Sequence, residues 1–324
     1  MDPHLTRRRL LWTALAGVPV VAACGSDGPT PPPQDAAARP APVVTPEAAA
    51  GGTEAAVPQP TESSSAAQPQ PTPAQAATAP RVRTIILDPG HGGEEIGAAS
   101  AIPGYPNLLE KDSNLAFAFR LRELLEADGF RVVMTRESDG RAFGWVRPNP
   151  AAATPGPNGE APNPTILTSR SDLQARVDYA NNNQGDLFLS LHSNDSGDIS
   201  ENGVEVWYCA DREDGAANEV LAHMLLGNVL DGLRAYGYRA NNRGIKEDRY
   251  FRVRNGRNFH LFVLGPRNPD ANHPRATTMP AALIENLFMR HARDQYVLRD
   301  PTAREAITQS MRLALNQFFE WRGG

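Results

Sequence analysis

Three residues with metal-binding side chains, His91, Glu110 and His192, are the strongest chemical signal in the sequence. His91 follows an apolar run that begins at Thr84 and stops in a Pro-Gly turn, and His192 closes a second apolar run that begins at Asp186. In open α/β sheets, functional side chains collect where strands end in loops. Two imidazoles and one carboxylate form a ligand set that leaves a tetrahedral zinc ion one position open for water. The set predicts a site for one Zn²⁺, although any of the three alone would be read as a surface polar residue.

Strands and helices are expected to alternate in the part of the chain that positions these residues. The expected strands cover residues 84–88, 131–135, 186–191, 203–208 and 281–285, and the expected helices cover 113–127, 169–183, 215–235 and 302–319. The helices are recognised by apolar residues at helical spacing, and Gly129 stands where the first of them should end. This order predicts an α/β fold: a single domain with a mixed, mostly parallel sheet, flanked by helices on both faces and preceded by a disordered tether.

Two stretches interrupt this alternation, residues 139–168 and residues 254–279. The first is rich in Pro, Ala, Asn and Gly, and the second in Asn, Arg and Pro. Loops of this length are either functional or insertions. They are expected either to border the active cleft or to decorate the surface.

The N-terminus has the pattern of an export signal followed by a tether. Three arginines, Arg7 to Arg9, precede an apolar stretch of roughly 14 residues, which is short for a membrane span. It ends in Ala-Ala-Cys24, which resembles a bacterial lipoprotein processing site, with an ordinary cleaved signal as the alternative. Residues 25–80 contain no Leu, Ile, Met, Phe, Tyr or Trp and are expected to be disordered. The expected organisation is a signal peptide over 1–24 with a lipidated Cys24, a linker over 25–80 and a catalytic domain over 81–324.

The charge and cysteine content of the last segment exclude some function classes. The chain has 32 basic and 37 acidic residues, of which 4 and 6 lie in the first 80, which leaves 28 and 31 in the domain. This near balance argues against nucleic acid as a partner. Cys209 is the only cysteine after Cys24, so the mature domain cannot form an intrachain disulfide.

Eight short segments, in order, resemble the zinc-dependent N-acetylmuramoyl-L-alanine amidases of the bacterial cell wall over residues 84–319. The segments are Leu87-Asp88-Pro89-Gly90-His91-Gly92-Gly93, Glu110-Lys111-Asp112 with Asn114-Leu115-Ala116, Thr135-Arg136, Arg176 with Ala180-Asn181, Ser190-Leu191-His192-Ser193-Asn194, Gly203-Val204-Glu205, Arg243-Gly244-Ile245-Lys246 and Leu283-Ile284-Glu285-Asn286. The ordered set is far more specific than any one motif.

The resemblance implies that His91, Glu110 and His192 bind zinc and that Glu285 is the catalytic glutamate. Glu285 ends a strand that is otherwise apolar, where a carboxylate is costly unless it is paired or functional. Without the resemblance, a simple ion pair with an arginine such as Arg243 would be the preferred interpretation. The segment after Glu285 departs from the usual family pattern, and this leaves substrate preference and regulation open.

Three further residues have weaker expectations. Asp88 is expected either to orient His91 or to cap the turn, and Asn194 either to bind substrate or to shape its turn. Arg243 is expected either to meet acidic groups of the stem peptide or to be solvated. His223, His260, His273 and His291 are interpreted as ordinary polar residues.

The expected function is hydrolysis of the amide between N-acetylmuramic acid and L-alanine by zinc-activated water. The alternatives are a zinc peptidase that acts on the stem peptide and a non-catalytic, wall-binding regulatory lipoprotein. The expected partners are peptidoglycan, the membrane through the lipid anchor, and a protein activator. The expected location is the cell envelope, at the outer face of the cytoplasmic membrane.

Overall fold

The fold is described from a computed structural model, which covers residues 81–153, 160–251, 260–267 and 275–323. The signal peptide and linker expected over residues 1–80, and His273, lie outside these ranges.

A six-stranded sheet in the order β4-β1-β5-β8-β6-β7 forms the centre of the domain. Its strands are β1 (Thr84–Pro89), β4 (Arg131–Met134), β5 (Leu187–Asn194), β6 (Val204–Tyr208), β7 (Asn242–Glu247) and β8 (Ala281–Phe288). Neighbouring strands are parallel except for β6 and β8, which are antiparallel. A separate two-stranded sheet pairs β2 (Ala99–Ser100) with β3 (Leu108–Leu109). The prediction of a mixed, mostly parallel sheet is confirmed.

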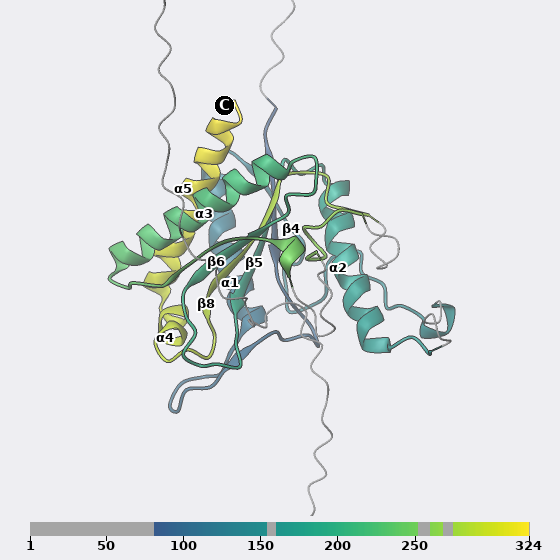
Figure 1. The fold of residues 1–324 in the computed structure, drawn as a ribbon, viewed down its shortest axis with the longest axis horizontal. Helices are drawn as coiled ribbons and strands as arrows, with labels where there is room; N and C mark the ends of the chain where they lie inside the picture. The colour runs from purple at the N-terminus through teal and green to yellow at the C-terminus, as the bar shows by residue number, and fades with distance from the viewer. Residues whose placement is uncertain (1–80, 154–159, 252–259, 268–274, 324) are drawn as a thin grey trace, which may run out of the picture. The chain divides into compact units, whose positions relative to one another are not determined.

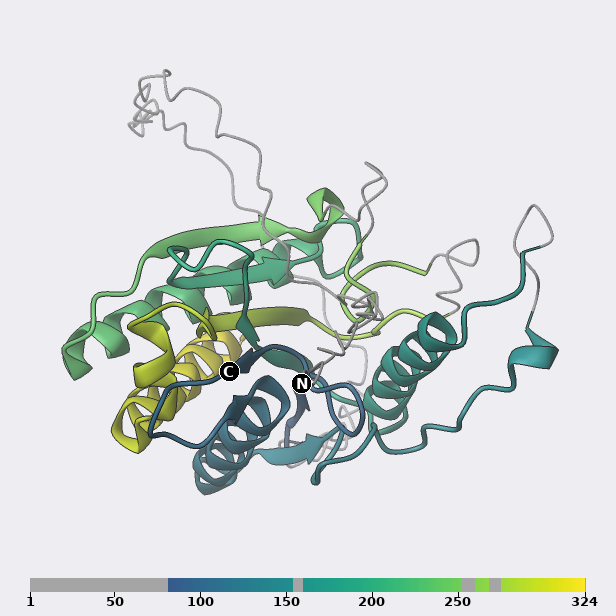
Figure 2. The ribbon, with the colours of Figure 1, turned by 90° about the horizontal axis from the view of Figure 1, so that it is seen from below.

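Helices cover both faces of this sheet, as Figures 1 and 2 show. The helical segments are α1 (Glu110–Ala127), the short η1 (Pro150–Ala152), α2 (Pro164–Asn182), α3 (Gly215–Tyr236), the short η2 (Asp248–Tyr250), α4 (Asp294–Arg299) and α5 (Pro301–Trp321). The larger hydrophobic core packs α1, α3 and α5 against one face, whereas the smaller core packs α2 and the segment 261–264 against the other. We call this second face the α2 face.

Alternation along the strands decides which residues reach each face. On β5, Leu189 and Leu191 belong to the larger core, and Phe188 belongs to the smaller core on the α2 face. On β8, Ile284 lies in the larger core and Leu283 in the smaller. Because successive side chains of a strand point to opposite faces, His192 and Glu285 both point toward the α2 face.

Three predictions about the elements need correction. Helix α2 begins at Pro164 instead of near 169, inside the stretch 139–168 that was predicted as a loop, with Asn163 capping its N-terminus. Helix α1 begins at Glu110 instead of near 113, and its first turn contains Glu110 and Asp112, whose negative charge suits the N-terminus of a helix. Strand β7 was not predicted, because it is a polar edge strand interrupted by Gly244, without the apolar run that marks the other strands. Among the described residues, none of the helices is both long enough and apolar enough to cross a membrane.

Candidate metal centre

The structure brings His91, Glu110 and His192 together from three separate elements. His91 lies in the turn after β1, Glu110 is the first residue of α1, and His192 lies near the end of β5. Strands β1 and β5 are parallel neighbours, so both imidazoles reach the same end of the sheet. One ligand atom from each of the three residues lies within 4.8 Å of the others.

Glu110 lies between the two imidazoles. Its Oε1 atom is 2.8 Å from Nε2 of His91 and 3.1 Å from Nδ1 of His192. Its other oxygen, Oε2, accepts a hydrogen bond of 2.8 Å from the backbone amide of Ala98. Glu110 is only 2% exposed. The carboxylate is therefore fixed by the protein while one oxygen remains directed toward both rings.

Two glycines make this approach possible. A Cβ atom at Gly90 would lie 2.2 Å from the ring of His192. A Cβ atom at Gly97 would lie 2.4 Å from Oε2 of Glu110, and the φ angle of Gly97 is +67°. Neither distance is possible for a real side chain, so glycine is required at both positions.

The backbone of His91 itself is in the left-handed region, with φ of 64°. This conformation costs free energy in a residue that carries a Cβ atom, and it persists only where neighbouring contacts hold it. Two fully buried arginines provide such contacts. Arg176 donates to the carbonyl oxygens of Pro89 and His91 at 2.9 and 2.7 Å, and Arg136 donates to those of Pro89 and Gly90 at 2.9 and 3.0 Å. The guanidinium groups of Arg176 and Arg136 thus hold the backbone of the turn that contains His91.

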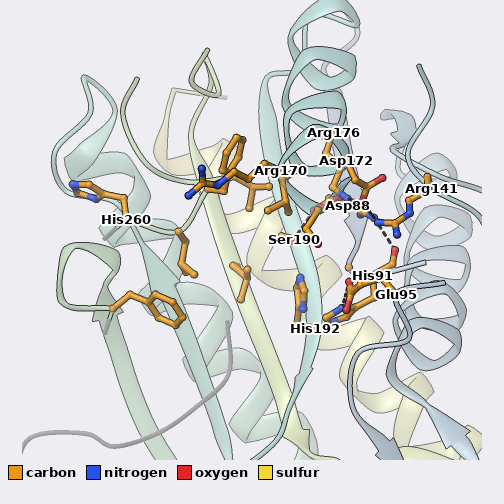
Figure 3. A pocket seen from close by; sticks show the side chains of 18 of the residues that line it. Asp88, His91, Glu95, Arg141, Arg170, Asp172, Arg176, Ser190, His192 and His260 are labelled. Carbon is orange, nitrogen blue, oxygen red and sulfur yellow. Dashed lines mark hydrogen bonds and ion pairs between the residues drawn. The ribbon is translucent and has the colours of Figure 1, made fainter. Parts of the chain in front are cut away.

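Glu95, and not Asp88, orients the ring of His91. Oε2 of Glu95 lies 2.6 Å from Nδ1 of His91 (Figure 3). Asp88 instead accepts hydrogen bonds from Thr135, Ser190 and Arg176 at 2.6–2.7 Å. The expectation that Asp88 orients His91 is therefore wrong, and it does not cap the turn either. The sequence signal for Glu95 was only its spacing of four residues from His91 in a glycine-rich turn.

The donor set fits a divalent cation. Burial alone would lower the pKa of His91, but Glu110 and Glu95 outweigh it and raise the pKa to about 10. Burial alone would raise the pKa of Glu110, but His91 and His192 hold it well below its usual range. Nε2 of His91 is buried and, within the described part of the chain, has no partner in hydrogen-bonding geometry, despite its proximity to Glu110. The site thus stabilises positive charge between nitrogen and oxygen donors of the kind that zinc prefers.

Glu285 lies beside this group on the neighbouring strand. In the register of the sheet it pairs with His192 of β5 on one side and with Glu205 of β6 on the other. It is 2% exposed and points toward the α2 face. Arg243 does not pair with it: Arg243 contacts Glu205 at 2.8 Å and Glu201 at 3.4 Å. The structure thus provides a carboxylate adjacent to the candidate metal ligands.

A cavity of about 240 Å³ opens on the α2 face next to His91 and His192. Figure 3 shows these two residues and Glu95 on one side of it and His260 on the other. Both predicted insertions contribute to the wall, the first through Arg141 and Ile166 and the second through residues 260–263. His260, interpreted from the sequence as an ordinary polar residue, is therefore part of the wall.

Asn194 and Arg243, the two remaining candidates for substrate contacts, lie outside the cavity wall. Asn194 is 3% exposed, and its side-chain oxygen accepts a hydrogen bond of 2.8 Å from the backbone amide of Asp195, which is the turn-shaping alternative. Arg243, besides its ion pairs, stacks over the ring of Phe288 at 4.8 Å. Within the described part of the chain, neither residue lines the cavity.

Comparison with known proteins identifies one family. The family model described as N-acetylmuramoyl-L-alanine amidase matches residues 85–317. The germination-specific N-acetylmuramoyl-L-alanine amidase of Bacillus subtilis is 28% identical over 244 residues, which cover 74% of this chain and 81% of that protein. The probable cell wall amidase LytH of Staphylococcus epidermidis is 26% identical over 237 residues, which cover 73% of this chain but only 58% of that protein.

A solved structure has the same fold. The CwlD amidase from Clostridioides difficile, solved in complex with the GerS lipoprotein, superposes with a TM-score of 0.51 at 24% identity. The match covers 74% of this chain and 99% of that one. At this identity the likeness shows the fold alone.

Proposed function

The chain belongs to the N-acetylmuramoyl-L-alanine amidase family, and on this basis we propose that it hydrolyses the amide between N-acetylmuramic acid and L-alanine in peptidoglycan. The observation that carries the proposal is the meeting of His91, Glu110 and His192 beside Glu285, within the residues that the family model matches. The names of the related amidases support the substrate.

We further propose that His91, Glu110 and His192 hold one zinc ion. When bound, zinc supplies a Lewis acid that polarises the amide carbonyl and makes water more acidic. Glu95 keeps the ring of His91 in a fixed orientation through their 2.6 Å contact. Glu110 is held by the Ala98 amide, so one of its oxygens remains directed toward both histidines.

Glu285 is proposed to move the proton. Its carboxylate would accept a proton from the attacking water and return it to the departing amine of L-alanine. Its position beside His192 supports this role, because proton transfer requires a base within hydrogen-bonding reach of the reacting water.

The deciding experiment compares Glu285→Gln with the unmodified chain on purified peptidoglycan. We expect Glu285→Gln to keep its zinc and to lose activity by about 10²- to 10⁴-fold. Mass spectrometry of the wild-type digest should show free stem peptides that begin with L-alanine. A digest with cleavage inside the stem peptide would instead identify a peptidase, and no release of any product would support the non-catalytic alternative.

Glu205→Gln is the matched control. Glu205 is the register partner of Glu285 and is similarly buried, at 4% exposed, but its Oε2 is bound by Arg243 and Lys246. We expect its activity to remain within tenfold of wild type. If Glu285→Gln were as active as this control, the proton-transfer role would be refuted. If Glu285→Gln lost its zinc, Glu285 would be identified as a metal ligand.

The location and partners are also proposals. We propose that Cys24 is lipidated and that residues 25–80 tether the domain to the outer face of the cytoplasmic membrane, within the cell envelope; the cysteine context and the composition of the linker support this. The CwlD amidase was solved in complex with the GerS lipoprotein; we propose that this chain likewise binds a protein partner, and that this partner activates it.

A further inference from the structure

A second cluster of potential ligands, Cys209, Asp248 and His260, lies away from the first. Cys209 follows β6 and Asp248 follows β7, and these parallel strands end side by side, with Tyr208 registered to Glu247. His260 approaches from the segment that lines the cavity. One ligand atom from each residue lies within 4.8 Å of the others.

This cluster lies toward the opposite end of the sheet from the first site. Strand β6 is antiparallel to β8, and Tyr208 is registered with Ala282, whereas His192 is registered with Glu285. Three residues along a strand correspond to roughly 10 Å. The two groups of ligands are therefore separate sites on the same face.

The side chains converge in the way that metal ligands do. Oδ1 of Asp248 lies 2.8 Å from Nδ1 of His260, and Sγ of Cys209 lies 3.8 Å from the same nitrogen. A tetrahedral ion with ligands at about 2.0–2.3 Å separates its donor atoms by roughly 3.3–3.6 Å. Small movements of these side chains would place all three donors around one ion.

The geometry does not suit a nucleophilic cysteine. A thiol, an imidazole base and an orienting carboxylate act as a relay only when the thiol and the carboxylate face opposite ring nitrogens. Here Cys209 and Asp248 both face Nδ1 of His260, and the carboxylate nearest Nε2, that of Asp211, lies 3.5 Å away without a hydrogen bond. Cys209 is also 0% exposed, so its sulfur is closed to a substrate.

Asp248 provides an independent indication of a bound cation. It is 0% exposed, and its Oδ2 atom is buried with no hydrogen bond of standard geometry among the residues that the structure describes, although the backbone amide of Leu261 and the thiol of Cys209 lie close to the carboxyl group. A buried carboxylate oxygen without a partner is costly, and a cation would satisfy it. Behind the imidazole, Nε2 of His260 lies 3.5 Å from Oδ2 of Asp211. Metal-bound histidines commonly donate a hydrogen bond to a carboxylate from the nitrogen that does not bind the ion; Asp211 lies within ion-pair distance of that nitrogen but makes no hydrogen bond to it in this structure.

We propose that Cys209, Asp248 and His260 bind a second divalent metal ion, of the Zn²⁺ class, distinct from the ion of the candidate catalytic centre. One thiolate, one imidazole and one carboxylate favour zinc over magnesium or calcium, which prefer oxygen ligands alone. Because His260 is continuous with Leu261 and Val263 of the cavity wall, this ion fixes that wall to the ends of β6 and β7.

Cobalt substitution tests the proposal. The full chain with Cys24→Ser has Cys209 as its only thiol, and after removal of metal it is titrated with Co²⁺. We expect two equivalents of cobalt per chain and a sulfur-to-cobalt charge-transfer band in the near ultraviolet. The candidate catalytic centre has only nitrogen and oxygen donors, so the band reports on the second site alone.

Variants then assign the band. In the Cys24→Ser background, Asp248→Asn and His260→Gln should each lose or strongly weaken the second equivalent together with its band, and Cys209→Ser should abolish the band. His192→Asn should lose the other equivalent and keep the band. The matched control is His291→Gln, because His291 contacts Asp294 at 3.0 Å in a similar pair without a thiol; it should retain both equivalents and the band.

Two outcomes would overturn the inference. The first is a titration of the folded Cys24→Ser chain in which no sulfur-to-cobalt band forms. The second is a titration in which both Asp248→Asn and His260→Gln keep the band and bind the second cobalt ion as tightly as the Cys24→Ser parent, which would mean that sulfur binds cobalt without Asp248 and His260. Neither result depends on the amidase activity of the candidate catalytic centre, which is measured separately. The proposed function and the proposed second metal site can therefore fail independently.

Discussion

Replacing Asp88 by asparagine should lower the free energy of unfolding by about 3–5 kcal/mol, the usual cost of breaking a buried ion pair. Asp88 is 1% exposed and lies 2.7 Å from Arg176, which is equally buried. Its other partners, the hydroxyl groups of Thr135 and Ser190, also donate to it. An asparagine has the same size and can keep its oxygen toward Thr135 and Arg176, but its NH₂ group would then face the Ser190 hydroxyl, and Arg176 would keep only Asp172 as a counter-charge. The same Arg176 donates to the carbonyl oxygens of Pro89 and His91, so loss of its partner Asp88 should disturb the turn of His91 and lower zinc affinity as well.

The pH dependence gives a second measure of the same interaction. Burial alone would raise the pKa of Asp88, but Arg176 and the two hydroxyl groups outweigh it and hold the pKa below the ordinary value of 3.8. A carboxyl group with a lowered pKa in the folded state contributes stability above its unfolded pKa and loses it as the pH falls toward the folded value. The difference between wild type and Asp88→Asn should therefore be constant above about pH 5 and shrink below pH 3.8.

Urea unfolding of the metal-free proteins measures both effects. With a slope of about 2–3 kcal/mol per M, the midpoint should fall by about 1–2 M at pH 7. Asp231→Asn is the control, because its ion pair with Arg234 is largely exposed and should contribute less than about 1 kcal/mol. A loss in Asp88→Asn no larger than in this control, or a difference that grows below pH 3.8, would refute the reasoning.

Three further perturbations have clear expected outcomes. Glu95→Gln should weaken zinc binding by about 10- to 100-fold, measured by competition with a chelator, because the substitution removes the negative charge beside Nδ1 of His91; unchanged affinity would remove Glu95 from the site. Gly90→Ala should abolish zinc binding, because its Cβ would overlap the ring of His192, whereas Gly140→Ala, with its nearest neighbour at 3.5 Å, should bind zinc normally; equal binding by both variants would contradict the geometry. Cys24→Ser should move the protein from the membrane fraction to the soluble fraction, because acyl chains contribute about 0.8 kcal/mol per buried methylene; a wild-type chain that is already soluble would rule out the anchor.

The sequence predicts the centre of the sheet well because its strands are buried on both faces. The apolar runs of β1, β5 and β8 are nearly continuous, which is typical of buried parallel strands. His91 and His192 could be predicted because each adjoins such a run where the turn begins. Strand β7 lacks this signal, since it lies at the edge of the sheet and is built from polar residues around a glycine.

The contacts that orient the site could not be predicted from spacing. Glu95 contacts His91 within a turn in which the backbone of His91 is left-handed, and that turn is held by Arg136 and Arg176, which are distant in sequence. A charged residue in a helical pattern is ordinarily solvated, yet Arg176 points into the core from α2. The burial of such a charged side chain can be predicted only when its partners are known.

The two proposed metal sites lie on one face of the sheet, and the direction of the strands explains why they lie at different ends of it. In a wholly parallel sheet, all loops that follow the strands would meet at a single edge. Here β6 and β7 run opposite to β1, β5 and β8. The residues after β6 and β7, Cys209 and Asp248, therefore lie at the far end of the α2 face from those at the ends of β1 and β5, and the cavity extends between His91 and His260. A reversal of two strands thus places a second group of ligands where it can act on the cavity wall without contacting the candidate catalytic centre.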